Sequence, residues 1–282
     1  MKIFLDSADL DEIKQAYELG IVDGITTNPS LIKKAVDVRL ARGEKLDLKA
    51  YITKILKIAK GTPVSLEVTE TTAKGMIEQA KKLYKMFNPI AKNVVIKIPI
   101  NTAFSEHEEK QMEGILAIKK ISRARIPVNC TLIFTPEQAL LAAKAGAKYV
   151  SPFAGRIDDY IRNQNKIQYA KSDYFPAEGL KKKKVMDDKG TVSGIHLVEQ
   201  CVDILQNYGY KTKVLAASIR NERQARECAL VNADIATLPL NVIKELTMHP
   251  KTYEGMQKFT RDIVIEYMKL TNGLKPHKRR KK

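Results

Sequence analysis

Cysteine is scarce in this sequence, which holds only Cys130, Cys201 and Cys228. Their number is odd and their spacing fits no metal-binding pattern, so we expect free thiols in a reducing, cytoplasmic compartment and no metal site. Long apolar runs are also missing, since none approaches the roughly 18 residues that a membrane-spanning helix needs. The N-terminus becomes polar at Asp6, which is too early for a signal peptide. We therefore expect neither a secreted disulfide scaffold nor a membrane partner.

Acidic residues are also few relative to basic ones. The chain has 32 Asp and Glu but 49 Lys and Arg, which gives a formal net charge of +17. Part of this excess lies in the block Lys181–Lys184 and in the run His277–Lys282, and such runs are usually solvated. A basic surface attracts anions such as sugar phosphates or nucleic acid. The chain shows no nucleic-acid-binding motif or aromatic platform, so we do not expect nucleic acid as a partner.

Strand-like and helix-like segments alternate along the chain. The eight predicted strands cover residues 2–6, 23–28, 63–68, 94–100, 127–133, 148–151, 213–218 and 235–238. Helical spacing follows several of them, at 9–19, from 29 onward, and at 73–84, 136–145 and 221–231. Regular alternation of this kind indicates an α/β fold with a parallel sheet, and eight repeats indicate a single closed (β/α)8 TIM barrel.

Two stretches interrupt this rhythm within the predicted barrel domain, residues 1–272. Residues 102–112 are charged, and residues 158–193 are rich in Lys, Asn, Gln and Asp. Both follow predicted strands, so we expect them over the C-terminal face of the barrel, as lids, oligomer contacts or disordered inserts. Residues 273–282 form a basic C-terminal tail.

Polar side chains stand at or near the C-terminal ends of seven predicted strands. They are Asp6, Asn28, Glu67, Lys97, Thr131, Ser151 and Ser218. In a barrel of parallel strands this face carries the active site. Asp6, Thr131 and Ser218 could each be a helix N-cap instead. Seven such residues that converge on one face are harder to explain as caps, and a lysine with two carboxylates is the most specific part of the set.

Lys97 lies inside an apolar, β-branched run, Val94–Ile100, that is typical of a buried strand. Burial of an unpaired ammonium is costly, and the group escapes that cost when it loses its proton. A neutral lysine amine attacks carbonyl carbon, so Lys97 is a candidate for Schiff-base formation. The alternative is that Lys97 lies on a sheet edge and extends its ammonium to water.

The phrases around these residues occur together in one known family. They are FLDSAD, GITTNPS, SLEVT, VVIKIP, VNCTLIF, QALLAAKAGAKYVSPFAGRIDD, VLAASIRN and ADIATLP. In this order, from residue 3 to about residue 240, they resemble the transaldolase family, in particular its short branch, which also contains fructose-6-phosphate aldolases. Each phrase alone is weak, but the combination is highly specific.

The resemblance implies a pentose phosphate pathway enzyme without a cofactor that moves a dihydroxyacetone unit between sugar phosphates. Lys97 would form a Schiff base with the C2 carbonyl of fructose 6-phosphate or sedoheptulose 7-phosphate. Asp6 would take the proton of the C4 hydroxyl as the C3–C4 bond breaks. Glu67 would activate a water that Thr131 positions, while Asn28 would hydrogen-bond donor hydroxyls.

Further positions of the family pattern would complete the pocket. Ser151 would line it, and Phe153 would face the enamine that remains on the lysine. Arg156, Ser218 and Arg220 would hold the distal phosphate, because a guanidinium binds phosphate oxygens with two parallel hydrogen bonds. A surface ion pair is the alternative for both arginines.

Two rival functions remain at this level. The first is an aldolase with the same lysine, which would release free dihydroxyacetone; the aldolases that resemble this chain carry a glutamine and a tyrosine where it has Glu67 and Phe153. The second is a basic nucleic-acid-binding or scaffold protein on a barrel fold, which would explain the lysine block and the tail. Glu67 and Phe153 favour the transferase over the aldolase, and Asp6, Glu67 and Lys97 together argue against a scaffold that has lost catalysis. We expect a homo-oligomer in the cytoplasm.

Overall fold

Eight parallel strands close into a barrel within the larger of two compact units, Met1–Ile243; the smaller unit is Lys244–Lys282. The computed structural model describes residues 1–181 and 186–270. The strands are β1 (Lys2–Asp6), β2 (Gly24–Thr26), β3 (Val64–Glu67), β4 (Val94–Pro99), β5 (Val128–Ile133), β6 (Tyr149–Pro152), β7 (Lys213–Ala216) and β8 (Ile235–Leu238). Each strand pairs in parallel with the next, and β8 pairs with β1. The predicted (β/α)8 barrel is therefore confirmed.

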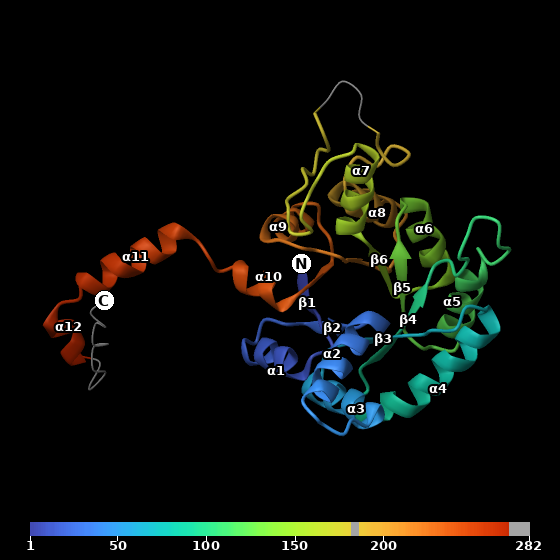
Figure 1. Cartoon of the computed structure of the whole chain (residues 1–282), viewed down its shortest axis with the longest axis horizontal. Coiled ribbons are helices and arrows are strands. Elements are labelled where there is room, and N and C mark those ends of the chain that lie inside the picture. Colours follow the sequence, from blue (N-terminus) through green and yellow to red (C-terminus); the bar gives the residue numbers. More distant parts are fainter. Residues whose placement is uncertain (182–185, 271–282) are drawn as a thin grey trace. The chain divides into compact units, whose positions relative to one another are not determined.

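Helices surround the barrel, as Figure 1 shows. They are α1 (Leu10–Glu18), α2 (Pro29–Ala41), α3 (Leu48–Ile58), α4 (Ala73–Ala91), α5 (Glu113–Arg123), α6 (Pro136–Ala145), α7 (Ala154–Gln164), α8 (Gly194–Asn207) and α9 (Glu222–Leu230). After the last strand come α10 (Leu240–Glu245), α11 (Pro250–Arg261) and α12 (Ile265–Leu270). Among the described residues no helix is both long and apolar enough to cross a bilayer.

Local sequence signals set the ends of these helices, and α6 is the clearest case. The Gln138 amide N–H donates to the Thr135 hydroxyl, and the Gln138 side-chain oxygen accepts from the Thr135 N–H. This capping box satisfies backbone donors that the first turn leaves free. Pro136 fits the first helical position, and Gly146 ends the helix at φ 97°.

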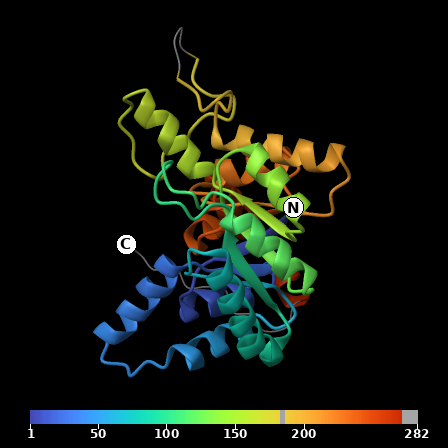
Figure 2. The same ribbon diagram turned by 90° about the vertical axis from the view of Figure 1, so that its right-hand side faces the viewer.

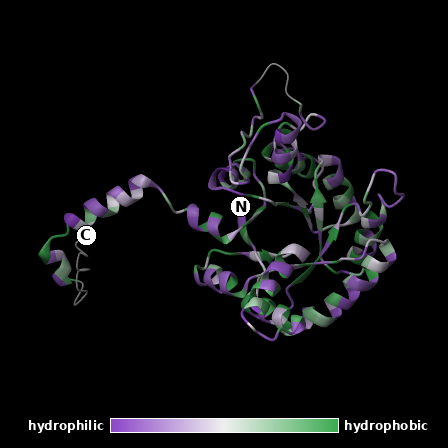
Figure 3. Ribbon diagram, in the orientation of Figure 1, coloured by the Kyte–Doolittle hydropathy of each residue, from purple (hydrophilic) through white to green (hydrophobic). Residues whose placement is uncertain are grey.

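Two separate apolar layers hold the barrel. The larger one lies between the strands and the helices, whose apolar faces turn inward in Figure 3. The smaller one lies inside the barrel and consists of Phe4, Val95, Tyr149, Leu215 and Ile235. Burial of apolar surface is the main term that favours the fold.

The three cysteines belong to the buried interior. Cys130, Cys201 and Cys228 are free thiols, as expected from their number. Burial raises the pKa of each of them, and that of Cys201 reaches about 12. A thiol that keeps its proton is a poor nucleophile, so these side chains act as small apolar groups.

The two predicted inserts differ in structure. Residues 102–112 connect β4 to α5 without forming a helix or strand. Residues 158–164 of the second range form the later part of α7, and the segment 165–181 runs beside that helix (Figure 2). The Arg162 guanidinium fixes this segment, because it donates to the Asp173 carbonyl at 2.7 Å and lies over the rings of Tyr169 and Phe175. The basic tail, residues 273–282, lies outside the described residues.

The smaller unit has little core of its own. No residue of α11 or α12 is buried. Tyr253, Met256 and Phe259 are spaced three apart on α11 and are all more than half exposed. A helix with an exposed apolar face ordinarily has a partner surface.

Candidate active site

A polar cavity of about 120 Å³ lies at the C-terminal mouth of the barrel. Its lining residues come from β1, β2, β4, β6, β7, β8 and the loops that follow them. They are Asp6, Thr26, Asn28, Lys97, Ser151, Phe153, Arg156, Leu215, Ala217, Ser218 and Thr237. Seven of the ten site residues predicted from the sequence are among them: Asp6, Asn28, Lys97, Ser151, Phe153, Arg156 and Ser218. Glu67, Thr131 and Arg220 lie outside this lining.

Lys97 is buried in the barrel, with 4% of its surface exposed. The alternative of a sheet edge does not hold, because Lys97 pairs with Glu67 on β3 and with Asn129 on β5. The register with Glu67 explains the ion pair between them, in which Nζ lies 3.1 Å from Oε2. Nζ also donates to the Thr27 carbonyl oxygen at 3.1 Å. The buried Lys97 amine thus has a carboxylate and a carbonyl oxygen as its partners.

Asp6 ends β1 within the same cavity, close enough to Lys97 to feel its charge. Burial raises the pKa of the Asp6 carboxyl, while the Lys97 charge and a hydrogen bond from Thr26 oppose that rise. The Thr26 hydroxyl donates to Oδ1 of Asp6 at 2.7 Å. A carboxyl with a raised pKa holds a proton nearer to neutral pH, which suits a general acid and base.

Asn129 links three strands across the barrel interior and was missed in the sequence. Its side-chain oxygen accepts from the Ser151 hydroxyl at 2.8 Å, and its amide donates to the Ser65 hydroxyl at 3.2 Å. The hydrogen bond to Asn129 fixes the direction of the Ser151 hydroxyl, since a hydroxyl has a single proton to donate. An amide between Val128 and Cys130 in an apolar strand was the signal that could have revealed it.

Two threonines in the lining were also missed. The Thr26 and Thr237 hydroxyls lie 2.5 Å apart, and Thr26 in turn donates to Asp6. Both side chains line the cavity beside the Asp6 carboxyl. Threonine is so common in strands that neither position stands out in the sequence.

Thr131 holds an unsatisfied polar atom. Its side-chain oxygen is buried and has no hydrogen-bond partner among the described residues. A buried hydroxyl without a partner costs free energy, and an ordered water is the usual remedy. Thr131 pairs with Pro99 on β4, two residues beyond Lys97.

Asn28 has a structural role in addition to its place in the lining. Its side-chain oxygen accepts from the Leu31 N–H at 2.9 Å and caps α2. The amide of Asn28 can still donate into the cavity. The caps of the helices after β1, β5 and β7 are Asp9, Thr135 and Asn221, so Asp6, Thr131 and Ser218 do not have the capping role that was their alternative.

Phe153 and Arg156 stand together at the start of α7. The Phe153 ring contacts the Phe134 ring edge to face, with centroids 5.7 Å apart. The Arg156 guanidinium lies over the Phe153 ring at 5.1 Å. Arg156 is exposed and has no ion pair within the described part of the chain, so its donors are open to an anion.

Arg220 differs from Arg156 because a carboxylate already holds it. Its two terminal nitrogens each lie 2.5 Å from an oxygen of Asp159, in a bidentate ion pair. Ser218, two residues before Arg220, has φ of 61°, in the left-handed region that serine rarely adopts. The Ser218 carbonyl accepts from the Gly155 N–H, and a Cβ at Gly155 would lie 2.3 Å from that carbonyl oxygen.

The chain is similar to proteins of known family over almost its whole length. The model of the family Transaldolase/Fructose-6-phosphate aldolase matches residues 3–275. The chain belongs to this family. Among curated relatives, "Probable transaldolase" of Chlorobaculum parvum is 45% identical over 93% of this chain and 97% of that protein. A "Probable transaldolase" of Prosthecochloris aestuarii is 43% identical over 94% and 98%, and one of Thermoplasma volcanium is 40% identical over 93% and 95%.

The barrel fold accounts for the place of this cavity. Catalytic groups of barrel enzymes stand at the C-terminal ends of several strands, as Asp6, Glu67 and Lys97 do. Among the described residues no group of His, Cys, Asp and Glu could hold a metal ion.

Proposed function

We propose that this chain is a transaldolase that forms a Schiff base through Lys97. The observation that carries the proposal is the buried Lys97 amine, 3.1 Å from the Glu67 carboxylate and in the same mouth as Asp6. An amine on a rigid strand loses little entropy when it attacks a carbonyl. Glu67 is placed to accept the proton that the ammonium gives up.

The reaction begins when Nζ of Lys97 attacks the C2 carbonyl of a ketose phosphate. Water leaves the resulting carbinolamine and an iminium remains. Glu67 supplies and removes protons at this stage through a water, which the unpaired hydroxyl of Thr131 would hold. The buried and otherwise unsatisfied oxygen of Thr131 supports this role.

Asp6 then removes the proton from the C4 hydroxyl. The C3–C4 bond breaks, its electron pair moves to the iminium, and the aldose phosphate leaves. The three-carbon unit stays on Lys97 as an enamine, whose carbon attacks the aldehyde of an acceptor aldose phosphate. The raised pKa of Asp6 lets it return its proton to the new hydroxyl.

The remaining side chains would bind the donor along its length. Asn28 and Ser151 would contact donor hydroxyls, with the Ser151 hydroxyl held in direction by Asn129. Arg156 would hold the distal phosphate, because its guanidinium is exposed at the cavity and free of carboxylates. Ser218 and Arg220 would stand beside it, with Arg220 oriented by Asp159.

The substrates would be the sugar phosphates of the pentose phosphate pathway, with fructose 6-phosphate or sedoheptulose 7-phosphate as donor in the cytoplasm. We also propose that the enzyme is a homo-oligomer. The exposed apolar face of α11 supports this second proposal, since a second copy of the chain would cover it.

An aldolase remains the rival for this site. It would protonate the enamine with water and free dihydroxyacetone. Phe153 favours transfer, because its ring lines the cavity against Phe134 and carries no hydroxyl that could orient a water. A basic nucleic-acid-binding scaffold is not favoured by any observation at this mouth.

Trapping with borohydride tests the Schiff base directly. Fructose 6-phosphate with borohydride should inactivate the enzyme and add a reduced three-carbon unit, which peptide mass mapping should place on Lys97. Lys97→Arg should lose both adduct and turnover while it keeps the fold, because arginine stays charged. Lys119→Arg, an exposed change on α5, is the matched control. An adduct elsewhere, or none, would falsify the mechanism.

A coupled assay separates the two functions. Release of glyceraldehyde 3-phosphate from fructose 6-phosphate should require erythrose 4-phosphate as acceptor. Release that proceeds at the same rate without the acceptor would identify an aldolase and refute the transferase proposal.

A further inference from the structure

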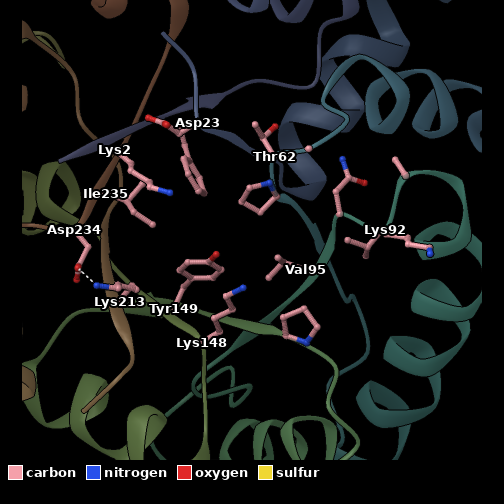
Figure 4. A pocket seen from close by; sticks show the side chains of 17 residues that line it. Lys2, Asp23, Thr62, Lys92, Val95, Lys148, Tyr149, Lys213, Asp234 and Ile235 are labelled. Atoms are coloured by element: carbon pink, nitrogen blue, oxygen red, sulfur yellow. Dashed lines mark hydrogen bonds and ion pairs between the residues drawn. The ribbon is translucent and has the colours of Figure 1, made fainter. Parts of the chain in front are cut away.

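A second and larger cavity, about 540 Å³, opens at the other end of the barrel (Figure 4). Its lining comes from the N-terminal ends of the strands. It includes Lys2 and Phe4 on β1, Tyr149 on β6, Lys213 on β7 and Ile235 on β8. A volume of this size is within the usual range for sites that bind small organic molecules.

The inner apolar cluster separates this cavity from the active-site mouth. We call the cavity at the N-terminal ends of the strands the lower cavity, and the active-site mouth the upper one. Four members of the cluster line the lower cavity, namely Phe4, Val95, Tyr149 and Ile235, whereas the fifth, Leu215, lines the upper one. The rings of Phe4 and Tyr149 meet edge to face, with centroids 6.4 Å apart. The lower cavity therefore has an apolar and largely aromatic floor.

Positive charge surrounds this floor. Figure 4 shows the side chains of Lys2 and Lys148 directed toward the middle of the opening, while Lys213 turns to Asp234. Nζ of Lys213 lies 2.6 Å from the Asp234 carboxylate, which also accepts from the Val214 N–H. Lys2 and Lys148 have no carboxylate partner among the described residues.

Two carboxylates, Asp23 and Asp234, face four lysines in this lining, Lys2, Lys92, Lys148 and Lys213, so positive charge stays in excess. Asp23 accepts from the Ile3 N–H at 2.9 Å, and Asp234 is committed to Lys213 and Val214. The ammonium of Lys148 lies 5.4 Å from the centre of the Tyr149 ring, between the aromatic floor and the solvent. The opening thus presents the ammonium groups of Lys2 and Lys148 beside an aromatic surface.

Two polar side-chain atoms in the lining also have no hydrogen-bond partner among the described residues. The buried side-chain oxygen of Asn93 has no hydrogen-bond partner among the described residues. The Tyr149 side chain is 7% exposed, and no hydrogen bond to its hydroxyl is found there. Burial raises the pKa of Tyr149, so the phenol keeps its proton and can donate.

We propose that this lower cavity binds an organic phosphate with an aromatic or planar apolar body. The body would lie on Phe4, Val95, Tyr149 and Ile235, and Lys2 and Lys148 would hold the phosphate. Lysines act on phosphate as point charges, and two of them match a phosphate dianion. The site is separate from the active-site mouth, and the inference does not rest on the proposed function.

Calorimetric titration with 1-naphthyl phosphate tests the site. The compound should bind with one site per chain, and inorganic phosphate and 1-naphthol should each bind at least about tenfold more weakly, because each lacks one half of the interaction. The double variant Lys2→Gln/Lys148→Gln should lose about tenfold in affinity. Both lysines are exposed, so the variant should fold normally.

The matched control is Lys120→Gln/Lys144→Gln, which removes the same net charge from exposed positions on α5 and α6. Its affinity should stay within about twofold of the parent chain. Arg156→Ala should also bind 1-naphthyl phosphate unchanged, which excludes the upper mouth as its site. No binding at millimolar concentration, equal losses in both double variants, or loss in Arg156→Ala would each overturn the proposal.

Discussion

At the scale of single residues, the ion pair between Lys97 and Glu67 is the central contact of the active-site mouth. Two charges taken out of water are tolerated when they stay together, and removal of one partner leaves the other unpaired. Glu67→Gln would remove the negative charge that is paired with Lys97, while the Thr27 carbonyl stays in place as an acceptor. We infer that Glu67 keeps the amine in place between turnovers as well as exchanging protons with it.

Phe153 decides between transfer and aldolysis in our proposal. Phe153→Tyr adds a hydroxyl that can orient a water and supply a proton. We expect the variant to release dihydroxyacetone from fructose 6-phosphate without an acceptor, and to lose part of its transfer rate. A coupled dihydroxyacetone assay measures the first effect.

Phe134→Tyr is the control for Phe153→Tyr, because it adds a hydroxyl to the other ring of the pair. It should leave the ratio of transfer to release unchanged. If Phe153→Tyr melts earlier and releases no dihydroxyacetone, Phe153 only packs the barrel, and the sequence argument for a transferase at this position is lost.

Arg156 and Arg220 should differ in what they contribute to phosphate binding. Arg156→Ala should lower kcat/KM for fructose 6-phosphate by about ten- to a hundred-fold, the value of a charge-assisted contact of roughly 1.5 to 3 kcal/mol. Arg220→Ala should cost less, because Asp159 already occupies its guanidinium. Dihydroxyacetone, which has no phosphate, should be used equally well by both variants. Equal losses for phosphorylated and unphosphorylated substrates would show that neither arginine binds phosphate.

At the scale of elements, three helices meet at one buried carboxyl. Asp158 on α7 accepts from the Gly194 N–H of α8 at 2.7 Å and from the Gln224 amide of α9 at 2.6 Å. Burial is the main cause that raises its pKa to about 7, against the opposing effect of these hydrogen bonds and of Arg162 and Arg220. Asp158 thus links α7, which carries Arg156, to α8 and to α9, which begins two residues after Arg220.

Asp158 predicts a pH dependence of stability. The folded chain binds this proton more tightly than the unfolded chain, so the stability that Asp158 contributes is complete below about pH 4 and is lost as the pH rises through 7. Relative to Asp158→Asn, the parent chain should gain about 1 to 3 kcal/mol between pH 8 and pH 5. Urea unfolding at both pH values measures this difference.

Asp203→Asn, an exposed change on α8, is the control for this pH series. It should follow the parent chain at both pH values. A constant difference between the parent chain and Asp158→Asn across the range would mean that Asp158 does not titrate there.

Several element boundaries depended on contacts that a sequence does not show. The prediction placed the end of the helix after β3 at residue 84, whereas α4 continues to Ala91 with Pro89 inside its last turn. α7 was not recognised, because its inward face carries Asp158 and Arg162, which interrupt the apolar spacing. Both residues are buried: Asp158 accepts from Gly194 on α8, and Arg162 donates to Asp173 in the segment that follows α7.

At the scale of the whole molecule, the barrel and its mouth were predictable for one physical reason. Alternating strands and helices allow few topologies, and a closed parallel barrel brings the ends of all its strands to one face. The pairing of Lys97 with Glu67 follows from the register of β3 and β4, and needed the structure. The lower cavity was not predicted, since its residues are ordinary lysines and apolar side chains at the starts of strands.

The smaller unit presents an apolar face on α11 that a second copy of the chain could cover. The exposed residues Tyr253, Met256 and Phe259 of α11 should be covered by a second copy if the enzyme is a homo-oligomer. Light scattering should then give a mass well above the 31.7 kDa of one chain. Met256→Ser/Phe259→Ser should lower that mass, because it removes most of the apolar area, whereas Gln257→Ser/Lys258→Ser on the same helix should not. A parent chain of monomeric mass refutes the homo-oligomer, and an unchanged mass in both variants means that another surface holds the subunits together.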